Sequence, residues 1–371
     1  MSKTKVMENK IYTALGLMSG TSLDGVDAAI IQTDGERLFG FGRATCVDFP
    51  DDGAPVKEAV ETALAWRFKG PAPNSLAAGS DYIDRVHVDA VQALGAEGVD
   101  IIGYHGQTVF HQPAIGGVKG RTLQLGNGQS LAAKFNVPCV YDFRSADVEA
   151  GGQGAPLAPI YHKALVAYSN LIGCVAVVNI GGVSNMTLVE GEAPLIATDC
   201  GPGNGPLDSW MALNGRGSYD TDGQASWAGQ VDMARIDRWL ARDFFKRPVP
   251  RSADRYDFDV LADMQDMSVE DGAATLASFC AQSIARDLKA FAPQTVIVCG
   301  GGRHNPAIMG MLDMHCAAKI MKAEDVGWDG DALEAQAFAY LAVRSLRGLP
   351  ISFPGTTGVK TPMTGGVVVH P

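Results

Sequence analysis

Several common nucleotide-binding and hydrolase motifs are absent from this sequence. The dipeptide Gly-Lys does not occur, so there is no G-x-x-x-x-G-K-[ST] loop and a P-loop NTPase is excluded. The absence of G-x-S-x-G argues against a serine hydrolase. No G-x-G-x-x-G follows the first apolar run, which makes a dinucleotide-binding fold unexpected.

Cysteine, positive charge and long apolar runs are also scarce. The seven cysteines form no C-x-x-C pair, which favours a reducing compartment. The chain carries 41 acidic and 30 basic residues, a formal charge of −11, without a basic block. The first ten residues, MSKTKVMENK, lack the apolar core of a signal peptide, and no run is long enough to span a bilayer. We therefore expect a soluble cytoplasmic protein with neither a nucleic-acid nor a membrane partner.

The 371 residues instead show the pattern of an α/β protein with two domains. Apolar runs broken by Gly, Ser and Asp predict three consecutive strands at 11–17, 26–32 and 39–49. A second series of strands begins at Cys174. Helical spacing of apolar residues predicts helices at 55–68, 80–95, 159–168, 203–214, 229–246, 270–291 and 331–346.

Two segments share one plan. ALGLMSGTSLDGVDAAII and AVVNIGGVSNMTLVE each place a glycine-containing turn between two apolar strands, and each opens a series of three strands. Chance is one explanation, since glycine turns are common in hairpins. The other is a pair of duplicated lobes whose turns face each other across a cleft.

Glycine turns at strand ends are candidate nucleotide contacts. In SGTSLDG, glycines permit close approach of a ligand, hydroxyl groups are abundant, and successive amides can form an anion nest. Asp24 in this turn is placed to hold Mg²⁺ through water. IGGVSN offers a second nest, and CGGGRHN offers a close approach for a base or ribose. Together these turns favour a nucleotide bound between two lobes.

Two polar segments carry the remaining chemistry. Asp199 follows a short apolar strand and precedes the turn CGPGN, which suits a general base beside a phosphate site, although an N-cap aspartate is an equal alternative. In DFRSADVEAGGQG, Arg144 is suited to gripping a carboxylate, or to a simple surface ion pair with Asp147. His105, His111 and His162 lack zinc-site spacing, so packed histidines are favoured.

With these motifs, the chain resembles the anhydro-N-acetylmuramic acid kinase family, which belongs to the superfamily of actin, sugar kinases and heat-shock ATPases. The resemblance extends almost from end to end. Its landmarks are GLMSGTSLDGVD, HGQTVFHQP, LGNG, DFRSADVEAGGQGAPLAP, NIGGVSN, TDCGPGN, DTDG, CGGGRHN and EAQAFAYLA.

The resemblance implies a two-lobed actin-like ATPase fold with a ribonuclease-H-like mixed βββαβαβα core in each lobe and a nucleotide cleft between them. We expect an N-terminal lobe over 1–145 and a C-terminal lobe over 146–371, with the final helix, 331–346, packing back near the cleft. The implied cofactors are ATP and Mg²⁺, and the implied partners are an anhydro amino sugar and a second copy of the chain in a homodimer.

The resemblance also implies residue roles, with Asp199 as the catalytic base. The expected first phosphate loop comprises Gly20, Thr21, Ser22, Leu23, Asp24, Gly25, Val26 and Asp27. The second loop comprises Gly181, Gly182, Ser184 and Asn185, and the adenosine-side glycines are Gly300, Gly301 and Gly302. The expected sugar-binding residues are His105, Gln107, Arg144, Asp147, Gln153 and Glu334.

The implied reaction combines ring opening with phosphoryl transfer. Asp199 deprotonates a water that attacks the anomeric carbon of 1,6-anhydro-N-acetylmuramic acid, and the freed O6 takes the γ-phosphoryl group of ATP. The physiological setting implied is murein recycling. A kinase for an ordinary sugar hydroxyl and a nucleotide-dependent switch protein are the alternatives. Tyr104, in place of the usual serine, and GNG, in place of GNP, depart from the family near the expected sugar site.

Overall fold

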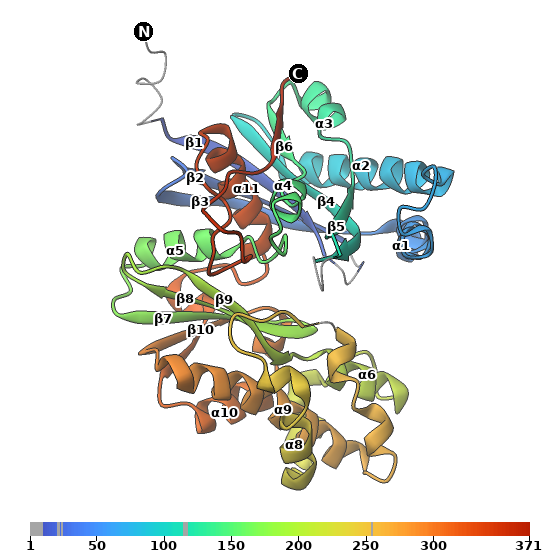
Figure 1. Cartoon of the computed structure of the whole chain (residues 1–371), viewed down its shortest axis with the longest axis vertical. Helices are drawn as coiled ribbons and strands as arrows, with labels where there is room; N and C mark the ends of the chain where they lie inside the picture. Colours follow the sequence, from blue (N-terminus) through green and yellow to red (C-terminus); the bar gives the residue numbers. More distant parts are fainter. Residues whose placement is uncertain (1–9, 21–22, 24, 114–117, 254) are drawn as a thin grey trace. The chain divides into compact units, whose positions relative to one another are not determined.

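A computed structural model describes residues 10–20, 23, 25–113, 118–253 and 255–371 (Figure 1). The chain forms two compact units, Met1–Tyr168 with Ala332–Pro371, and Ser169–Asp331. This division differs from the expected boundary after residue 145. Residues 146–168 and the final helix belong to the first unit.

The first unit is built on one mixed sheet. Its strands are β1 (Tyr12–Ser19), β2 (Gly25–Thr33), β3 (Leu38–Asp48), β4 (Ile101–Gln112), β5 (Arg121–Leu125), β6 (Cys139–Tyr141) and β12 (Val367–Val369). Its helices are α1 (Ala54–Trp66), α2 (Asn74–Leu94), α3 (Gly128–Phe135), α4 (Ser145–Glu149), α5 (Pro159–Tyr168) and α11 (Leu333–Leu346). The strand order is β12-β6-β4-β1-β2-β3, with β5 paired to β4.

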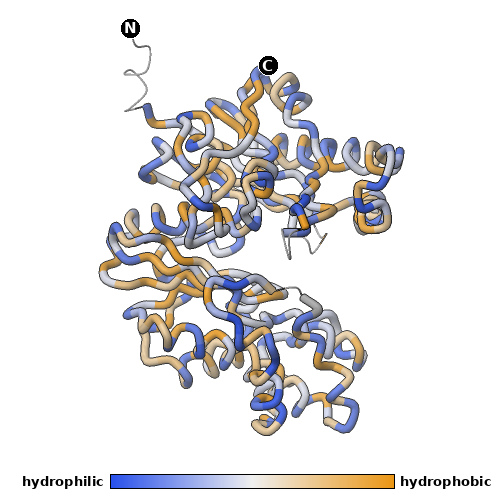
Figure 2. The backbone as a smooth tube through the Cα atoms, in the orientation of Figure 1, coloured by the Kyte–Doolittle hydropathy of each residue, from blue (hydrophilic) through white to orange (hydrophobic). Residues whose placement is uncertain are grey.

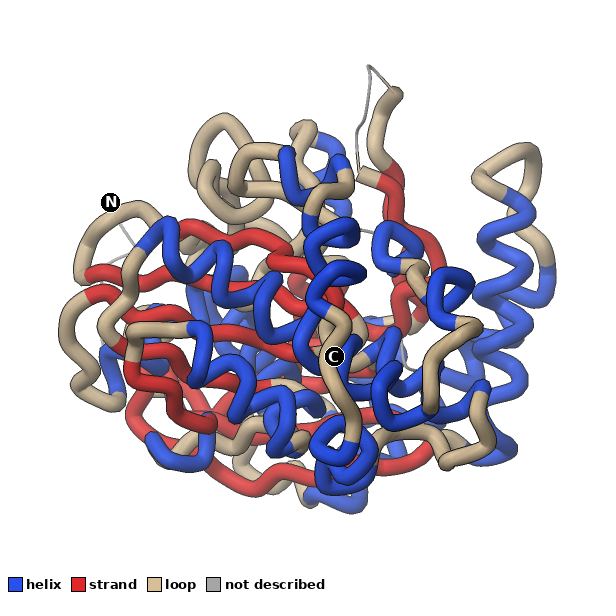
Figure 3. Tube along the Cα trace, turned by 90° about the horizontal axis from the view of Figure 1, so that it is seen from below, coloured by secondary structure: helices blue, strands red, loops and turns tan. Residues whose placement is uncertain are grey.

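The second unit has a sheet in the order β11-β10-β7-β8-β9. Its strands are β7 (Cys174–Ile180), β8 (Val183–Glu190), β9 (Ile196–Pro202), β10 (Thr295–Cys299) and β11 (Lys319–Lys322). Its α-helices are α6 (Gly205–Leu213), α7 (Gln224–Ala228), α8 (Met233–Leu240), α9 (Val269–Phe291) and α10 (Pro306–His315). Figure 3 distinguishes the strands and helices of both units by colour.

The two sheets share one topology. In each, the first three strands pair antiparallel, and the first strand also pairs in parallel with a later strand that carries a further parallel neighbour. This arrangement confirms the expected mixed βββαβαβα core in each unit. The echo between the two glycine-turn segments therefore reflects a repeated fold.

The final helix, α11, packs closely on the sheet of the first unit because two glycines of that sheet leave space for the helix backbone. A Cβ at Gly16 of β1 would clash with the backbone of α11, and one at Gly103 of β4 would clash with the Phe338 carbonyl. Neighbouring side chains on the opposite face, among them Leu15 and Ile102, join a buried cluster with residues of α2. Because strand side chains alternate between faces, α2 and α11 cover opposite faces of the sheet.

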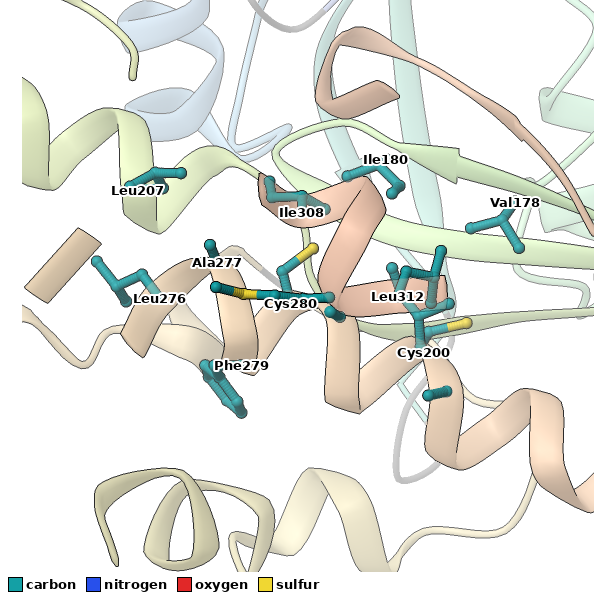
Figure 4. Close-up of a cluster of buried hydrophobic side chains, with 14 of the residues drawn as sticks. Val178, Ile180, Cys200, Leu207, Leu276, Ala277, Phe279, Cys280, Ile308 and Leu312 are labelled. Atoms are coloured by element: carbon teal, nitrogen blue, oxygen red, sulfur yellow. The ribbon is translucent and has the colours of Figure 1, made fainter. Parts of the chain in front are cut away.

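The second unit has its own apolar core, formed by the sheet with α9 and α10. Figure 4 shows Val178 and Ile180 of β7 near Leu312 and Ile308 of α10 and Cys280 of α9. The hydrophobic colouring of the strands in Figure 2 reflects this burial. Among the described residues, no helix has the length and apolar character needed to cross a bilayer.

Several element boundaries differ from expectation. The helix expected at 80–95 begins at Asn74. The helix expected at 229–246 is replaced by α8 and a separate 3₁₀ turn, Asp243–Lys246. Helix α10 was not predicted, although Asn305 caps it and Pro306 opens it.

Candidate functional site

Asp199 lies on β9, at the edge of the second unit's sheet, beside a chain segment that returns at residue 251. The backbone N–H of Ala253 donates to Oδ2 of Asp199 at 2.7 Å. The N–H of Asp199 donates to the carbonyl of Arg251 at 3.0 Å. Among the described residues, the Ala253 N–H is the one hydrogen-bond donor to the Asp199 carboxylate.

The environment of Asp199 suits a general base. Burial raises the pKa of its carboxyl to about 6, while the Ala253 N–H and the positive charge of Arg251 oppose the rise. Such a group is ionised at neutral pH and still basic enough to take a proton in a reaction. The N-cap alternative is wrong, because Asp199 lies within β9 and the N-cap position of α6 is occupied by Asn204.

The Gly181–Gly182 turn joins β7 to β8 and is bound by the segment that follows Asp199. Gly203 donates its N–H to Gly182 at 3.0 Å, and Asn204 donates to Gly181 at 2.8 Å. A Cβ at Gly203 would clash with the Gly181 carbonyl, so packing requires glycine there. A Cβ at Gly182 would meet no atom within 4 Å. The protein's own packing therefore does not require glycine at position 182.

The three glycines after β10, Gly300 to Gly302, also differ in how closely the protein packs against them. Gly300 has a φ of 77° and lies against Asn179, while a Cβ at Gly302 would clash with Ile180. A Cβ at Gly301 would again meet nothing within 4 Å. Gly301 is thus the member of this group whose surroundings leave open space.

The other residues expected in the second phosphate loop have mixed environments. Ser184 is fully buried, and its hydroxyl donates to the Gly201 carbonyl at 3.1 Å. Asn185 is half-buried and lies opposite Asp199 in the β8–β9 pairing. Asn185 and Asp199 are therefore direct neighbours across this strand pair.

An amide–carboxylate pair next to this turn was missed by sequence reasoning. Asn204 donates from Nδ2 to Asp208 at 2.6 Å, and its Oδ1 is buried without a partner among the described residues. Burial raises the pKa of Asp208 to about 6, and the charge of Asp220 adds to the effect. The spacing of four residues in NGPLD was the available signal, because such residues share one helix face.

The first glycine turn is only partly described. Thr21, Ser22 and Asp24, including the proposed metal contact at Asp24, lie outside the described residues. Gly20 precedes them and Leu23 has a φ of 57°. Among the remaining expected residues, Gly25 packs against β3, Val26 is fully buried in the core, and Asp27 is half-buried on β2.

Gln107 anchors the start of this turn. The hydroxyl of Ser19 donates to its Oε1 at 2.5 Å, and its Nε2 donates to the carbonyl of Gly20 at 3.1 Å. Gln107 is completely buried. Its amide therefore holds Ser19 and Gly20, the two residues at the start of the turn.

Arg144 and His105 form the centre of a network in the first unit. The Nε of Arg144 donates to His105 Nε2 at 3.1 Å, so the proton of the neutral ring lies on Nδ1, which donates to Gly106 at 2.8 Å. Burial and the charge of Arg144 hold the pKa of His105 well below its usual value. His105 also stacks on Phe338 of α11 at 4.5 Å between ring centres.

Asp147 holds the glycine-rich segment around this network. Its Oδ1 accepts from Gly154 at 2.6 Å, and its Oδ2 accepts from Thr357 at 2.6 Å. Arg144 donates to the Gly154 carbonyl at 2.8 Å, and the N–H of Gln153 donates to the Thr357 carbonyl at 2.7 Å. Asp147 and Arg144 are therefore joined through Gly154 and do not form the surface ion pair considered as an alternative.

Glu334 lies in the first turn of α11, where its charge interacts with Arg144 and with Asp27. Burial lowers the pKa of Arg144 to about 10, while the carboxylates of Glu334 and Asp147 oppose the change. The structure thus brings together most of the expected sugar-binding residues on one network in the first unit.

A pocket of about 130 Å³ lies beside His105. Its lining residues are Tyr104, His105, Gly106, Thr122, Leu123, Gln124, Leu125, Gly126, Tyr141, Asp142 and Ser145. The hydroxyl of Tyr104 donates to Asp84 of α2 at 2.8 Å, and its ring contacts His87 edge-on. Tyr104 and the GNG segment, the two departures from the family pattern, share Asp84 as a hydrogen-bond partner. The Asn127 N–H of GNG also donates to Asp84, at 2.8 Å.

These features define a two-unit α/β protein with a basic carboxylate and open glycine turns in one unit and an arginine–histidine network in the other. A family model described as anhydro-N-acetylmuramic acid kinase matches residues 12–371. The chain is 49% identical to the anhydro-N-acetylmuramic acid kinase of Acidiphilium cryptum, over 96% of this chain and 98% of the relative. It is 46% identical to that of Phenylobacterium zucineum, over 96% and 99%.

The chain belongs to the anhydro-N-acetylmuramic acid kinase family, as its motifs predicted, and as a member of a kinase family it is an enzyme. Among solved structures, it is similar to a ROK family glucokinase from Streptomyces griseus in complex with glucose and AMPPNP. That similarity has 14% identity and a TM-score of 0.42, covering 89% of this chain and 99% of the glucokinase.

Proposed function

We propose that this enzyme uses ATP and water to convert 1,6-anhydro-N-acetylmuramic acid into N-acetylmuramic acid 6-phosphate and ADP. Family membership supports the choice of substrate. The observation that carries the chemical proposal is the half-held carboxylate of Asp199, with a pKa raised to about 6 and one oxygen engaged by Ala253.

Asp199 acts on water because the substrate offers no free O6 hydroxyl. The base takes a proton from water as the water oxygen bonds to the anomeric carbon. The bond from that carbon to O6 breaks, and its electron pair remains on O6. O6 then bonds to the γ-phosphorus of ATP while the bond to the β-phosphate oxygen breaks, releasing ADP. The proton held by Asp199 returns to solvent.

The phosphates of ATP are assigned to the glycine turns. Gly182 and Gly301 have open space where other glycines are packed, and Gln107 fixes the carbonyl of Gly20 at the start of the first turn. Backbone amides in such turns bind phosphate oxygens. Mg²⁺ is expected with ATP, because Mg²⁺ is usually bound by phosphates and one or two carboxylates. When bound, it would neutralise phosphate charge, with Asp24 as the proposed contact through water.

The sugar carboxylate is assigned to Arg144. Its Nε and Nη1 are held by His105 and Gly154, while Nη2 makes no hydrogen bond with the described residues. This geometry presents one guanidinium edge in a fixed orientation. Glu334, which interacts electrostatically with Arg144, is assigned to a hydroxyl of the sugar.

Oxygen tracing tests the proposal. The enzyme is incubated with ATP, Mg²⁺ and the anhydro sugar in ¹⁸O-labelled water, and the product is analysed by mass spectrometry. We expect a 6-phosphate with one ¹⁸O at the anomeric position. A phosphorylated sugar whose anhydro ring is intact, or whose anomeric oxygen is unlabelled when first formed, would instead support a kinase of an ordinary hydroxyl. Because the free anomeric centre exchanges oxygen slowly, early time points and a control with preformed product are required.

We further propose that the reaction serves the recycling of cell-wall murein in the cytoplasm and that the enzyme acts as a homodimer. Size-exclusion chromatography with light scattering tests the last point.

A further inference from the structure

We propose that Arg251, paired with Asp287, is a positioning residue for Asp199. Arg251 anchors the chain segment whose backbone orients the carboxylate, and it places a positive charge beside the base. The inference rests on the proposed role of Asp199 as the general base.

The returning segment is docked along the open edge of β9. The N–H of Arg251 donates to the hydroxyl of Thr198 at 3.0 Å, and its carbonyl accepts the N–H of Asp199 at 3.0 Å. Two residues later, Ala253 donates to the Asp199 carboxylate. The orientation of the base therefore depends on the position of residues 251–253.

The side chain of Arg251 fixes that position. Its Nη2 donates to Asp287 of α9 at 2.5 Å and to the Cys200 carbonyl at 3.4 Å, while its guanidinium lies 4.6 Å from the ring centre of Phe244. The side chains of Arg251 and Asp287 are only 5% and 6% exposed. The segment is thus tied to α9 as well as to the sheet.

A buried ion pair is not the simplest way to achieve such an anchor. Two charges lose hydration on burial, and well-packed apolar side chains of similar size often stabilise a fold equally well or better. The position of this pair suggests another use for its charge. Arg251 favours the ionised form of Asp199, and it also compensates Asp287, so the buried cluster carries one net negative charge instead of two.

The other groups around the base do not replace this charge. Arg251 on the returning segment is the charged group that acts on Asp199. Cys200 on β9 interacts with both Asp199 and Asp287, and burial raises the pKa of its thiol well above the usual value, so it is neutral. Arg286 of α9 is exposed and acts on Asp287, so Arg251 is the buried cation of the cluster.

The decisive measurement is the pH dependence of kcat/KM for the anhydro sugar. The test variant is Arg251→Gln, which removes the positive charge and leaves Asp287 in place. Because the Arg251 charge favours ionised Asp199, we expect the acidic limb to move up by about one pH unit, which corresponds to about a tenfold loss well below the midpoint. The KM for ATP should stay within about twofold.

Matched variants separate this role from a general loss of packing. Arg251→Lys keeps the charge and should leave the limb within about 0.3 pH units of wild type. Arg235→Met removes another largely buried arginine of the second unit, which pairs with Asp232 and Asp266, and should not move the limb. Thermal unfolding is measured for each variant. If Arg251→Gln does not fold, Arg251→Met combined with Asp287→Leu leaves neither partner buried alone, and its acidic limb should move up by less because the negative charge of Asp287 is also removed.

The inference would be overturned if a folded variant that lacks the Arg251 charge kept the wild-type acidic limb in its pH profile of kcat/KM. The proposed base has a separate test. If Asp199→Asn retains the wild-type rate and pH profile, the role of Asp199 fails, and the inference about Arg251 fails with it.

Discussion

Ala253 donates its backbone N–H to the carboxylate of Asp199 at 2.7 Å, although the two residues are 54 positions apart in the chain. This bond fixes one oxygen of the candidate base and favours its ionised form. Burial acts in the opposite direction and is the larger effect, so the pKa of Asp199 is raised to about 6.

The first prediction concerns the pH dependence of activity. A base must be deprotonated to act, so kcat/KM should be half-maximal near pH 6 and fall about tenfold per pH unit below it. Initial rates with saturating ATP, measured from pH 4.5 to pH 8.5, check this expectation. A midpoint near pH 4, the ordinary value for an aspartate, would contradict the environment described for Asp199.

The second prediction concerns stability. The folded-state pKa of Asp199 lies above its unfolded value of about 4, so the folded protein binds the proton more tightly between pH 4 and pH 6. Wild type therefore bears the cost of a half-buried charge at pH 7.5. Asp199→Asn removes that charge and should raise the free energy of unfolding by about 1–3 kcal/mol at pH 7.5.

Denaturant unfolding of wild type and Asp199→Asn at pH 7.5 and pH 4 measures this difference. The gain should shrink at pH 4, where the wild-type carboxyl is protonated in the folded state. Equal stability at pH 7.5, or a gain that grows toward low pH, would be inconsistent with the raised pKa.

The third prediction separates packing glycines from ligand glycines. Gly203→Ala introduces a Cβ against the Gly181 carbonyl and should cost about 1–3 kcal/mol of folding free energy. Gly182→Ala meets no protein atom and should change stability by less than about 0.5 kcal/mol. If the phosphates of ATP approach this turn, Gly182→Ala should still weaken ATP binding about tenfold.

Thermal unfolding and ATP-binding calorimetry on the same two variants distinguish these effects. Unchanged ATP affinity in Gly182→Ala would remove this turn from the proposed phosphate site.

The fourth prediction concerns Tyr104, which replaces the usual serine of the family. Because its hydroxyl is bonded to Asp84, Tyr104→Phe should cost about 1 kcal/mol of stability. The ring remains in place, so we expect the KM for the sugar to stay within about twofold. A much larger change in KM without a loss of stability would give Tyr104 a direct role in binding.

Much of the fold was predictable because its signals are local. Apolar runs and glycine turns identified the first three strands of each unit, and the similarity between residues near Gly20 and Gly181 indicated the repeated core. Helix α10 was missed even though Asn305 and Pro306 are standard helix-start residues.

The division into units was not predictable from local pattern. Helix α11 lies more than 200 residues from β4 in the chain, and its place depends on glycines of β1 and β4 that allow close backbone contact. Nothing in the local sequence of α11 identifies the sheet that it covers.

The candidate site shows the same limit. The motif TDCGPGN pointed to Asp199, but Ala253, which donates to its carboxylate, and the Arg251–Asp287 pair come from distant segments. Similarly, Asp147 was predicted as a substrate contact, and its Oδ2 accepts a hydrogen bond from Thr357, which lies 210 residues away in the chain. Sequence pattern identifies polar residues near a site, while their distant partners follow only from the fold.

The most direct test of the account is the rate of sugar-dependent ADP formation by Asp199→Asn. Asparagine can still accept the Ala253 N–H, so the local structure should be retained while the base is lost. We predict a loss in kcat of at least about 10²-fold with ATP affinity unchanged. Turnover at the wild-type rate by a folded Asp199→Asn variant would contradict the central claim that Asp199 activates water.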